Sequence, residues 1–246
     1  MGNLYSAQEK IWNKVFENEA LLGIPHTLLC GGTALARFHL HHRLSYGLDF
    51  FTPIRFNPEA LLLKLGSIGI EISEPIIESR SGFCRQLTGL VNNNGEPVKI
   101  DFVEDIYQGM FDVMNEGLAR TEVIDGLYHR KIRTVSDVYS KDGRVKGSRQ
   151  TARDSFDLHV LSQSVEPLSK FVARINSHGA NIPIEGLCSG ILSMPWIDLM
   201  DDFGELEKLN QWVDCEMLDV RRSLEKEALF LQNQEMDNYH GTGLES

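Results

Sequence analysis

The sequence predicts an α+β fold, with a mixed α/β N-terminal half followed by a mainly helical C-terminal half. Two strand-like runs flank Asn92-Asn93-Asn94-Gly95, and an Asn-Gly pair between such runs is a strong hairpin signal. From Val135 onward, the apolar residues recur at helical spacing. We therefore expect an α/β core over residues 1–105, a helical domain over 106–236 and a flexible tail over 237–246.

In the N-terminal half, helices and strands should alternate. Apolar residues at helical spacing indicate an amphipathic helix from Leu4 to Leu22, which Gly23-Ile24-Pro25 ends. Asn57 and Pro58 are a helix cap and a first helical residue, so they indicate the start of another helix. The other expected elements are strands over His26–Cys30 and Leu48–Thr52, a helix over Thr33–Leu40, and extended segments over Ile70–Glu78, Gly82–Val91 and Pro97–Val103.

After residue 104 the pattern becomes helical. The segment Val123–Ile132 is still interpreted as strand, and helices are predicted near 135–147, 150–163, 167–178 and 204–233. Two tryptophans and three methionines between residues 194 and 217 are expected to belong to the helical core.

The composition limits the classes of function. A net charge of -11, from 24 basic and 35 acidic residues, argues against a protein that coats nucleic acid without specificity. No apolar run reaches the roughly 18 residues of a membrane helix, and the N-terminus has no signal-peptide pattern. The four cysteines are scattered and form no CxxC pair, which indicates reduced, mostly buried thiols in a cytoplasmic protein.

Three features of the first half could form one site. Gly31-Gly32-Thr33 lies between a strand and a helix, where backbone N–H groups can approach an anion, although ordinary tight turns use the same residues. Arg43, Ser45 and Asp49 lie before and within the second strand, and Asp101 lies in the strand VKIDFV. Two acids that point the same way from adjacent strands can hold a divalent cation. A metal beside a phosphate cradle is the apparatus of phosphoryl or nucleotidyl transfer.

The stretch GGTALARFHLHHRLSYGLDFFT, residues 31–52, resembles the motif of the AbiEii-type nucleotidyltransferase toxins, which is close to GGTAL, a variable stretch and RxSxDxDFF. VKIDFV resembles the third-carboxylate strand of that family. Lys141 precedes RQTARDSFDL, Arg149–Leu158, which is similar to the family's R-three residues-RDxxDL. The matching segments keep the family's order from about residue 30 to about residue 160.

The resemblance implies a polymerase-β-like nucleotidyltransferase core and a role for each matching residue. Asp49 and Asp101 would bind one or two Mg²⁺ or Mn²⁺ ions, and Lys141 would offset phosphate charge beside Asp154. The residues that would bind the nucleotide are Gly31, Gly32, Thr33, Arg43, Ser45 and Lys141.

The resemblance also implies a biological role. It is that of a cytoplasmic toxin of a toxin–antitoxin or phage abortive-infection system, with an antitoxin encoded nearby. Such a toxin would transfer a nucleotide from a nucleoside triphosphate to an RNA hydroxyl, which in characterised relatives is the 3′ end of tRNA.

One position departs from the family pattern, since Gly47 stands where an acid is expected two residues before Asp49. Acids two apart on a strand project to one face and can grip a metal together. Three interpretations stay open: a degenerate member with weak or lost transfer that acts by binding, a member whose missing ligand comes from Glu104 or Asp105, and an inactivated copy of an active toxin.

Two charged features of the C-terminal half also have alternative interpretations. Asp154 and Asp157 lie three apart, on one helix face, where they could belong to the site or form a solvated face paired with arginines. The cluster His129–Arg133 could be a solvated strand end or a contact for an RNA backbone.

Overall fold

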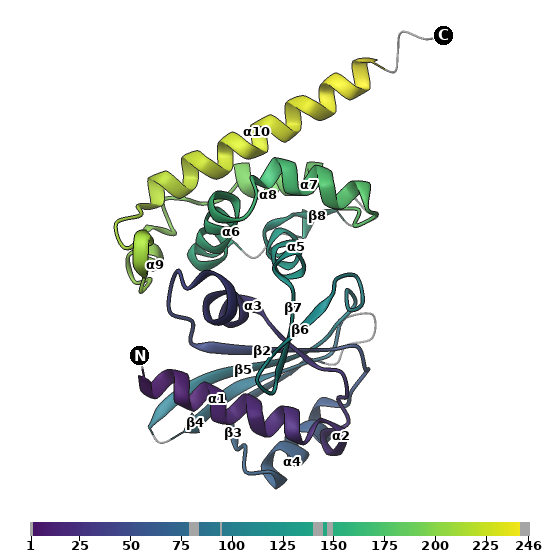
Figure 1. Cartoon of the computed structure of the whole chain (residues 1–246), viewed down its shortest axis with the longest axis vertical. Helices are drawn as coiled ribbons and strands as arrows, with labels where there is room; N and C mark the ends of the chain where they lie inside the picture. Colours follow the sequence, from purple (N-terminus) through teal and green to yellow (C-terminus); the bar gives the residue numbers. More distant parts are fainter. Residues whose placement is uncertain (1, 79–83, 94, 140–144, 147–149, 242–246) are drawn as a thin grey trace. The chain divides into compact units, whose positions relative to one another are not determined.

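The computed structural model describes residues 2–78, 84–93, 95–139, 145–146 and 150–241 (Figure 1). The chain forms two compact units, Met1–Leu127 and Tyr128–Ser246. The division lies later than the predicted boundary between residues 105 and 106. The reason is a hairpin after residue 105, whose second strand packs against the first strand of the N-terminal sheet.

In the first unit, helices alternate with strands, and this confirms the α+β prediction for the N-terminal half. Its helices are Gly2–Glu17 (α1), Glu19–Leu22 (α2), Gly31–Ala34 (α3), the π-helical segment Leu35–Leu40 (η1) and Pro58–Ser67 (α4). Its strands are Leu28–Cys30 (β1), Gly47–Thr52 (β2), Ile72–Glu78 (β3), Gln86–Asn93 (β4), Glu96–Glu104 (β5), Val113–Glu116 (β6) and Ala119–Glu122 (β7).

The first five strands form one mixed sheet in the order β1-β2-β5-β4-β3. β2 and β5 run parallel, while the other neighbouring strands of this sheet are antiparallel. The pairing of β4 with β5 confirms the hairpin predicted around residues 92–95. β6 and β7 form a separate two-stranded ribbon that the sequence analysis did not predict.

One face of the sheet carries the core of the first unit. Leu48 and Phe50 of β2 and Ile100 and Phe102 of β5 are fully buried there, and the Phe50 and Phe102 rings stack at 4.9 Å. Apolar residues of α1 and α4 complete this cluster. Because side chains alternate along a strand, the residues between these apolar ones project from the other face, and Asp49 and Asp101 are among them.

The helix α4 begins as the sequence predicts. The Asn57 side chain accepts a hydrogen bond from the Ala60 N–H at 2.7 Å, and Pro58 occupies the first helical position. Proline suits that position because the N–H it lacks would have no partner within the helix.

Helix α5 (Ile124–Val135) begins in the first unit and continues into the second. The prediction of a strand over Val123–Ile132 is therefore wrong. Leu127, Tyr128 and Ile132 are buried. Ile132 follows Tyr128 by four residues and Leu127 by five, which places all three on one side of a helix. In so short a segment, the apolar residues fit the period of a strand as well as that of a helix.

The second unit is helical, as predicted, apart from one short ribbon. Its helices after α5 are Ala152–Ser164 (α6), Leu168–Ser177 (α7), Ile184–Leu192 (α8), Met200–Gly204 (α9), the 3₁₀ turn Asn210–Trp212 (η2) and Met217–Gly241 (α10). α10 packs against α6, α7 and α8. The Tyr128 and Phe171 rings stack at 4.0 Å in the core of this unit.

Three predictions for the second unit need correction. Instead of a helix near 135–147, the described residues contain strands Val138–Tyr139 (β8) and Val145–Lys146 (β9). The last helix starts at Met217 rather than at 204, because Asn210 has a left-handed φ of 54° that interrupts any helix there. It continues to Gly241, past the predicted start of the tail at 237, since no glycine or proline interrupts it earlier.

The four cysteines, all within the described residues, form no disulfide, and only Cys30 and Cys188 are buried, fewer than predicted. No helix among the described residues is long and apolar enough to cross a membrane.

Candidate active site

Asp49 and Asp101 are direct register partners on the parallel strands β2 and β5. Both project from the face opposite the apolar core, because their neighbours in sequence fill that core. Directly paired residues on adjacent strands have their side chains next to each other. The structure therefore brings together the two acids to which the sequence analysis assigned the metal.

The carboxylate of Asp101 is largely buried and held by three side chains. Its Oδ1 accepts hydrogen bonds from the Thr88 hydroxyl and, at 3.4 Å, from Gln86 Nε2. Its Oδ2 forms an ion pair with Lys99 Nζ at 2.6 Å, in which the Asp101 side chain is 9% exposed and the Lys99 side chain 53% exposed. Thr88 lies directly opposite Asp101 on β4, so neighbouring strands fix the orientation of this acid.

The two glycines at the start of α3 make room for the charged side chains of the site. Gly31 has a left-handed φ of 72°, and a Cβ built on it would overlap the Asp49 carboxylate. A Cβ on Gly32 would overlap the Arg43 guanidinium, and Arg43 is itself buried. Any larger residue at these two positions would push away Asp49 or Arg43.

Hydrogen bonds connect the glycine turn to the start of β2. The buried Thr33 hydroxyl lies 2.9 Å from Ser45 Oγ and also contacts the carbonyl oxygen of Gly47. Gln8 Nε2, from α1, donates to the carbonyl oxygen of Ser45 at 2.6 Å. These contacts place Thr33 and Ser45 in one cluster with Gly32 and Arg43, four of the residues to which the motif resemblance gives a role in nucleotide binding.

Gly47, the position that departs from the family pattern, has space for a side chain. A Cβ there would meet only the Lys99 carbonyl oxygen at 3.6 Å and Lys99 Cβ at 3.9 Å, which are ordinary van der Waals contacts. Gly47 and Lys99 are register partners on β2 and β5. Packing therefore does not force a glycine at this position.

Neither Glu104 nor Asp105 replaces the missing acid. Glu104 lies three residues after Asp101, so it projects from the other face of β5, and its carboxylate accepts the Arg85 N–H at 3.1 Å. Asp105 follows the end of the strand, and its carboxylate accepts the Tyr107 N–H at 2.9 Å. Within the part of the chain that the structure describes, no three His, Cys, Asp or Glu residues form a group that could hold a metal ion.

The donor set fits one magnesium ion better than two. Two carboxylates on paired strands supply the hard oxygen ligands that Mg²⁺ prefers, and Mg²⁺ keeps several waters when it binds. The Asp101 carboxylate already forms an ion pair with the Lys99 ammonium through Oδ2. A second ion would have to share the same two acids.

In the second unit, Lys131 of α5 joins the two acids of α6. Lys131 Nζ lies 2.6 Å from Asp154 Oδ1 and 2.7 Å from Asp157 Oδ2, and all three side chains are buried. The Thr151 hydroxyl, at the cap of α6, also contacts Asp154, at 2.7 Å. The alternative of a solvated face paired with arginines is therefore wrong for Asp154 and Asp157.

Lys141, the lysine predicted to act with Asp154, lies outside the described residues, as does the segment 147–149. The described lysine that contacts Asp154 is Lys131. It belongs to the cluster His129–Arg133, which is helical rather than a strand end. His129 is buried there, and burial, followed by the charges of Arg133 and Arg130, lowers its pKa to about 4.

Lys99 was not among the predicted site residues, and the buried ion pairs of Lys131 were not foreseen within the cluster His129–Arg133, although the sequence contains a signal for each. Lys99 lies two residues before Asp101, so the period of a strand already places both on one face. Lys131 falls on the apolar stripe of α5, four residues after Leu127, and a lysine on such a stripe requires a buried partner. The strand interpretation of this segment concealed that stripe.

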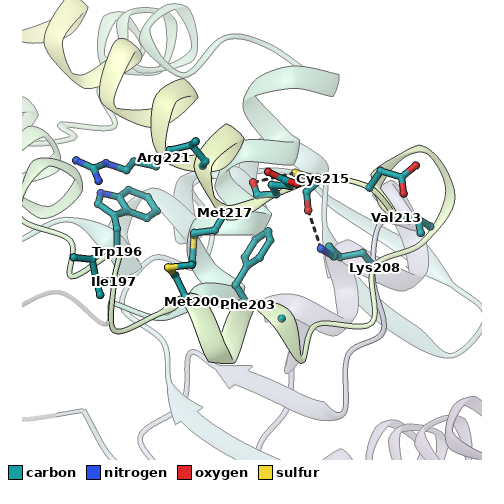
Figure 2. A pocket seen from close by; sticks show the side chains of 13 residues that line it. Trp196, Ile197, Met200, Phe203, Lys208, Val213, Cys215, Met217 and Arg221 are labelled. Carbon is teal, nitrogen blue, oxygen red and sulfur yellow. Dashed lines mark hydrogen bonds between the residues drawn. The ribbon is translucent and has the colours of Figure 1, made fainter.

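A separate pocket of about 720 Å³ lies in the second unit, at the start of α10 (Figure 2). Trp196, Met200, Phe203 and Met217 line its apolar part, and Lys208 Nζ donates to the Cys215 carbonyl oxygen at 2.7 Å beside them. It contains none of the predicted site residues. Met200 is exposed in this pocket, which corrects its assignment to the core.

Comparison with known proteins gives one family and a set of similar folds. The family described as nucleotidyl transferase AbiEii toxin, type IV TA system, matches residues 19–186. No curated protein matches the chain.

Two solved structures match nearly the whole chain. JHP933 from Helicobacter pylori is 19% identical, with coverage of 98% of this chain and 97% of that one and a TM-score of 0.52. A protein described as a nucleotidyltransferase from H. pylori is also 19% identical, with coverage of 95% and 96% and a TM-score of 0.53. At this identity, the likeness establishes a shared fold.

Proposed function

This chain belongs to the family of AbiEii nucleotidyl transferase toxins of type IV toxin–antitoxin systems, and we propose that it transfers a nucleotide from a nucleoside triphosphate to an RNA hydroxyl. The family match covers β1, the glycine turn, β2 and β5, so it includes both acids and every candidate nucleotide-binding residue of the first unit. The RNA acceptor, with the 3′ end of tRNA as the first candidate, rests on the resemblance of the motifs.

The observation that carries this proposal is the pairing of Asp49 with Asp101 beside the glycine turn. The register of β2 and β5 sets the two acids side by side, and the missing side chain of Gly31 leaves the space that Asp49 fills. A triphosphate would bind against Gly32, Arg43 and Ser45. The buried guanidinium of Arg43 suits phosphate because it offers several N–H donors and a permanent positive charge.

In the proposed reaction, the RNA hydroxyl oxygen forms a bond to the α-phosphorus of the triphosphate. The bond from that phosphorus to the oxygen bridging to the β-phosphate breaks, pyrophosphate leaves, and the hydroxyl proton passes to solvent. Asp49 and Asp101 would hold one Mg²⁺, which would supply charge stabilisation for the phosphate oxygens. Arg43 and Ser45 would orient the triphosphate for attack.

In the second unit, we propose that Lys131, and not Lys141, is the lysine that acts as the partner of Asp154. Its ammonium contacts two carboxylates, so its first role is to hold α5 and α6 together.

A second candidate function follows from position 47. Gly47 stands in place of an acid, and Lys99 forms an ion pair with Asp101. Such a chain could bind a nucleotide without transferring it. This protein would be a catalytically impaired binding protein with the same fold.

One assay separates the two functions. The wild-type chain is incubated with Mg²⁺, total tRNA and each of the four labelled ribonucleoside triphosphates in turn, with Asp49→Asn as the negative control. Label on RNA that depends on Asp49 supports transfer. If no nucleotide labels tRNA or total RNA while equilibrium dialysis still detects nucleotide binding, the binding protein is the correct interpretation.

A further inference from the structure

Lys99 provides a positive charge inside the candidate site that the proposed reaction leaves unexplained. Its side chain shares a face of the sheet with Asp49 and Asp101, because Lys99 and Asp101 are two residues apart on β5. Its register partner is Gly47, the position at which the family pattern has an acid. The strand pair therefore carries a cation next to the place where a carboxylate is missing.

We propose that Lys99 is a fixed cation of the nucleotide site, which takes the place of a second divalent ion on Asp101 and binds the triphosphate directly. This inference rests on the proposed function, since it assigns a substrate contact within the same site. With Lys99 in this role, the chain would bind a nucleotide with one divalent ion. A site with three acids can hold two such ions.

The charge balance supports this assignment. Three carboxylates with two divalent ions have a net charge of plus one, and two carboxylates with one ammonium and one divalent ion have the same net charge. Losing the acid at position 47 and gaining Lys99 thus leaves the charge that faces a triphosphate unchanged. A chain with Gly47 but without Lys99 would lack this balance.

The exposure of the ion pair fits a role in ligand binding. The Asp101 side chain is 9% exposed and both of its oxygens have partners within the protein, whereas the Lys99 side chain is 53% exposed. An ammonium has three N–H donors, and the pair with Asp101 uses Oδ2 alone. Lys99 can therefore keep its contact with Asp101 and donate to a phosphate oxygen from its exposed side.

The test uses two probes that require no knowledge of the base or of the acceptor. Inorganic tripolyphosphate in EDTA measures binding to the fixed cations, and Mn²⁺ alone measures binding to the carboxylates, both by calorimetry at low and high salt. The variants are Lys99→Met and Lys99→Gln, compared with Lys10→Met. Lys10 is exposed on α1, which packs on the opposite face of the sheet.

We expect the wild-type chain to bind one Mn²⁺. Lys99→Met and Lys99→Gln should weaken tripolyphosphate binding in EDTA by about tenfold, as expected for one charged hydrogen bond, with a smaller difference at high salt. They should tighten Mn²⁺ binding, because Asp101 loses a competing cation. Lys10→Met should change neither affinity.

Unchanged tripolyphosphate affinity in folded Lys99 variants would overturn the proposal, and so would weaker Mn²⁺ binding, which would show that Lys99 only positions Asp101. If one variant does not fold, the other decides. Failure of the proposed function looks different: RNA would stay unlabelled by the wild-type chain whatever the effect of Lys99 on the two probes.

Discussion

Gly31 lies against the carboxylate of Asp49, so closely that a Cβ on Gly31 would overlap that carboxylate. The contact joins the turn after β1 to the middle of β2, two strands that pair antiparallel. It gives this glycine a physical requirement in addition to its left-handed φ of 72°. A side chain at position 31 would move the Asp49 carboxylate, so the role of Gly31 can be tested by measuring metal binding to Asp49.

Gly31→Ala should therefore harm both stability and metal binding. The left-handed backbone costs a non-glycine residue about 1–2 kcal/mol, and the methyl group would also displace Asp49. We expect urea unfolding to show a loss of at least that size, and calorimetry to show weaker Mn²⁺ binding. The matched control is Gly66→Ala in α4, where a Cβ meets nothing within 4 Å; this change should be neutral or slightly stabilising.

Asp49→Asn should abolish transfer while it leaves the fold intact. The change removes a charged metal ligand but keeps the shape of the side chain, and metal stabilisation of phosphoryl groups is worth several kcal/mol. We expect the rate of RNA labelling to fall at least about 100-fold, with an unchanged circular dichroism spectrum. Asp112→Asn, at an exposed acid of the same unit, is the control. A fall of less than fivefold for Asp49→Asn would exclude a role for this acid in the reaction.

The sequence predicts the first unit well because its signals are local. The Asn-Gly pair in the sequence predicts the hairpin of β4 and β5, whose pairing the structure shows, and Asn57 with Pro58 fixes the start of α4. Those signals depend on backbone preferences of a few adjacent residues. The strand order is not local, and the parallel pairing of β2 with β5 comes from packing over many residues.

The second unit was harder to predict because its signals depend on tertiary partners. The strand prediction for Val123–Ile132 failed since its apolar residues fit either period over so short a run. Lys131 makes sense only once α5 is seen to contact the acids of α6. In the candidate site, the acids and glycines followed from the motif. The strand period alone places Lys99 on the same face as Asp101, but its position opposite Gly47 depends on the register between β2 and β5.

Lys131→Met should destabilise the second unit strongly. The change leaves Asp154 and Asp157 buried without their ammonium partner, and breaking a buried ion pair in this way costs about 3–5 kcal/mol. The triple variant with Asp154→Asn and Asp157→Asn should recover much of that loss, because no buried charge then lacks a partner.

The control for this series is Lys170→Met, at an exposed lysine of α7. We expect its free energy of unfolding in urea to equal that of the wild type within about 0.5 kcal/mol. If Lys131→Met were equally harmless, the cluster would not hold α5 to α6.

His129 should make the second unit sensitive to acid. Burial, together with Arg133 and Arg130, lowers its pKa from 6.5 to about 4 in the folded chain. Between these two values the unfolded chain binds the extra proton, so stability should fall as the pH drops from 6.5 to 4 and level off below. The size of this loss is at most about 3 kcal/mol.

His129→Gln should reduce this acid sensitivity, because glutamine does not titrate. Urea unfolding at pH 7, 6, 5 and 4.5 measures the effect as the difference in slope between the variant and the wild type, whatever the variant's stability at pH 7. Identical slopes would show that His129 takes up its proton with the same affinity in both states.

Gly47→Asp should strengthen metal binding and transfer. A Cβ at position 47 makes only ordinary contacts with Lys99, so the new carboxylate can stand beside Asp49 on the same face of β2. The ion then gains a third carboxylate ligand, and we expect the affinity for Mg²⁺ to rise about tenfold. Gly66→Asp, which adds the same charge to α4 on the other side of the sheet, should leave Mg²⁺ affinity unchanged.

The same substitution tests the charge balance without metal. A second acid beside Asp49 is repelled by it, but here Lys99 stands directly opposite position 47 and can pair with the new carboxylate. We therefore expect Gly47→Asp to change the metal-free stability little by itself, and to cost more in a Lys99→Met background. If Gly47→Asp gives neither tighter Mg²⁺ binding nor more RNA labelling, position 47 is not a missing ligand, and the nucleotide-binding protein without transfer becomes the better account of this chain.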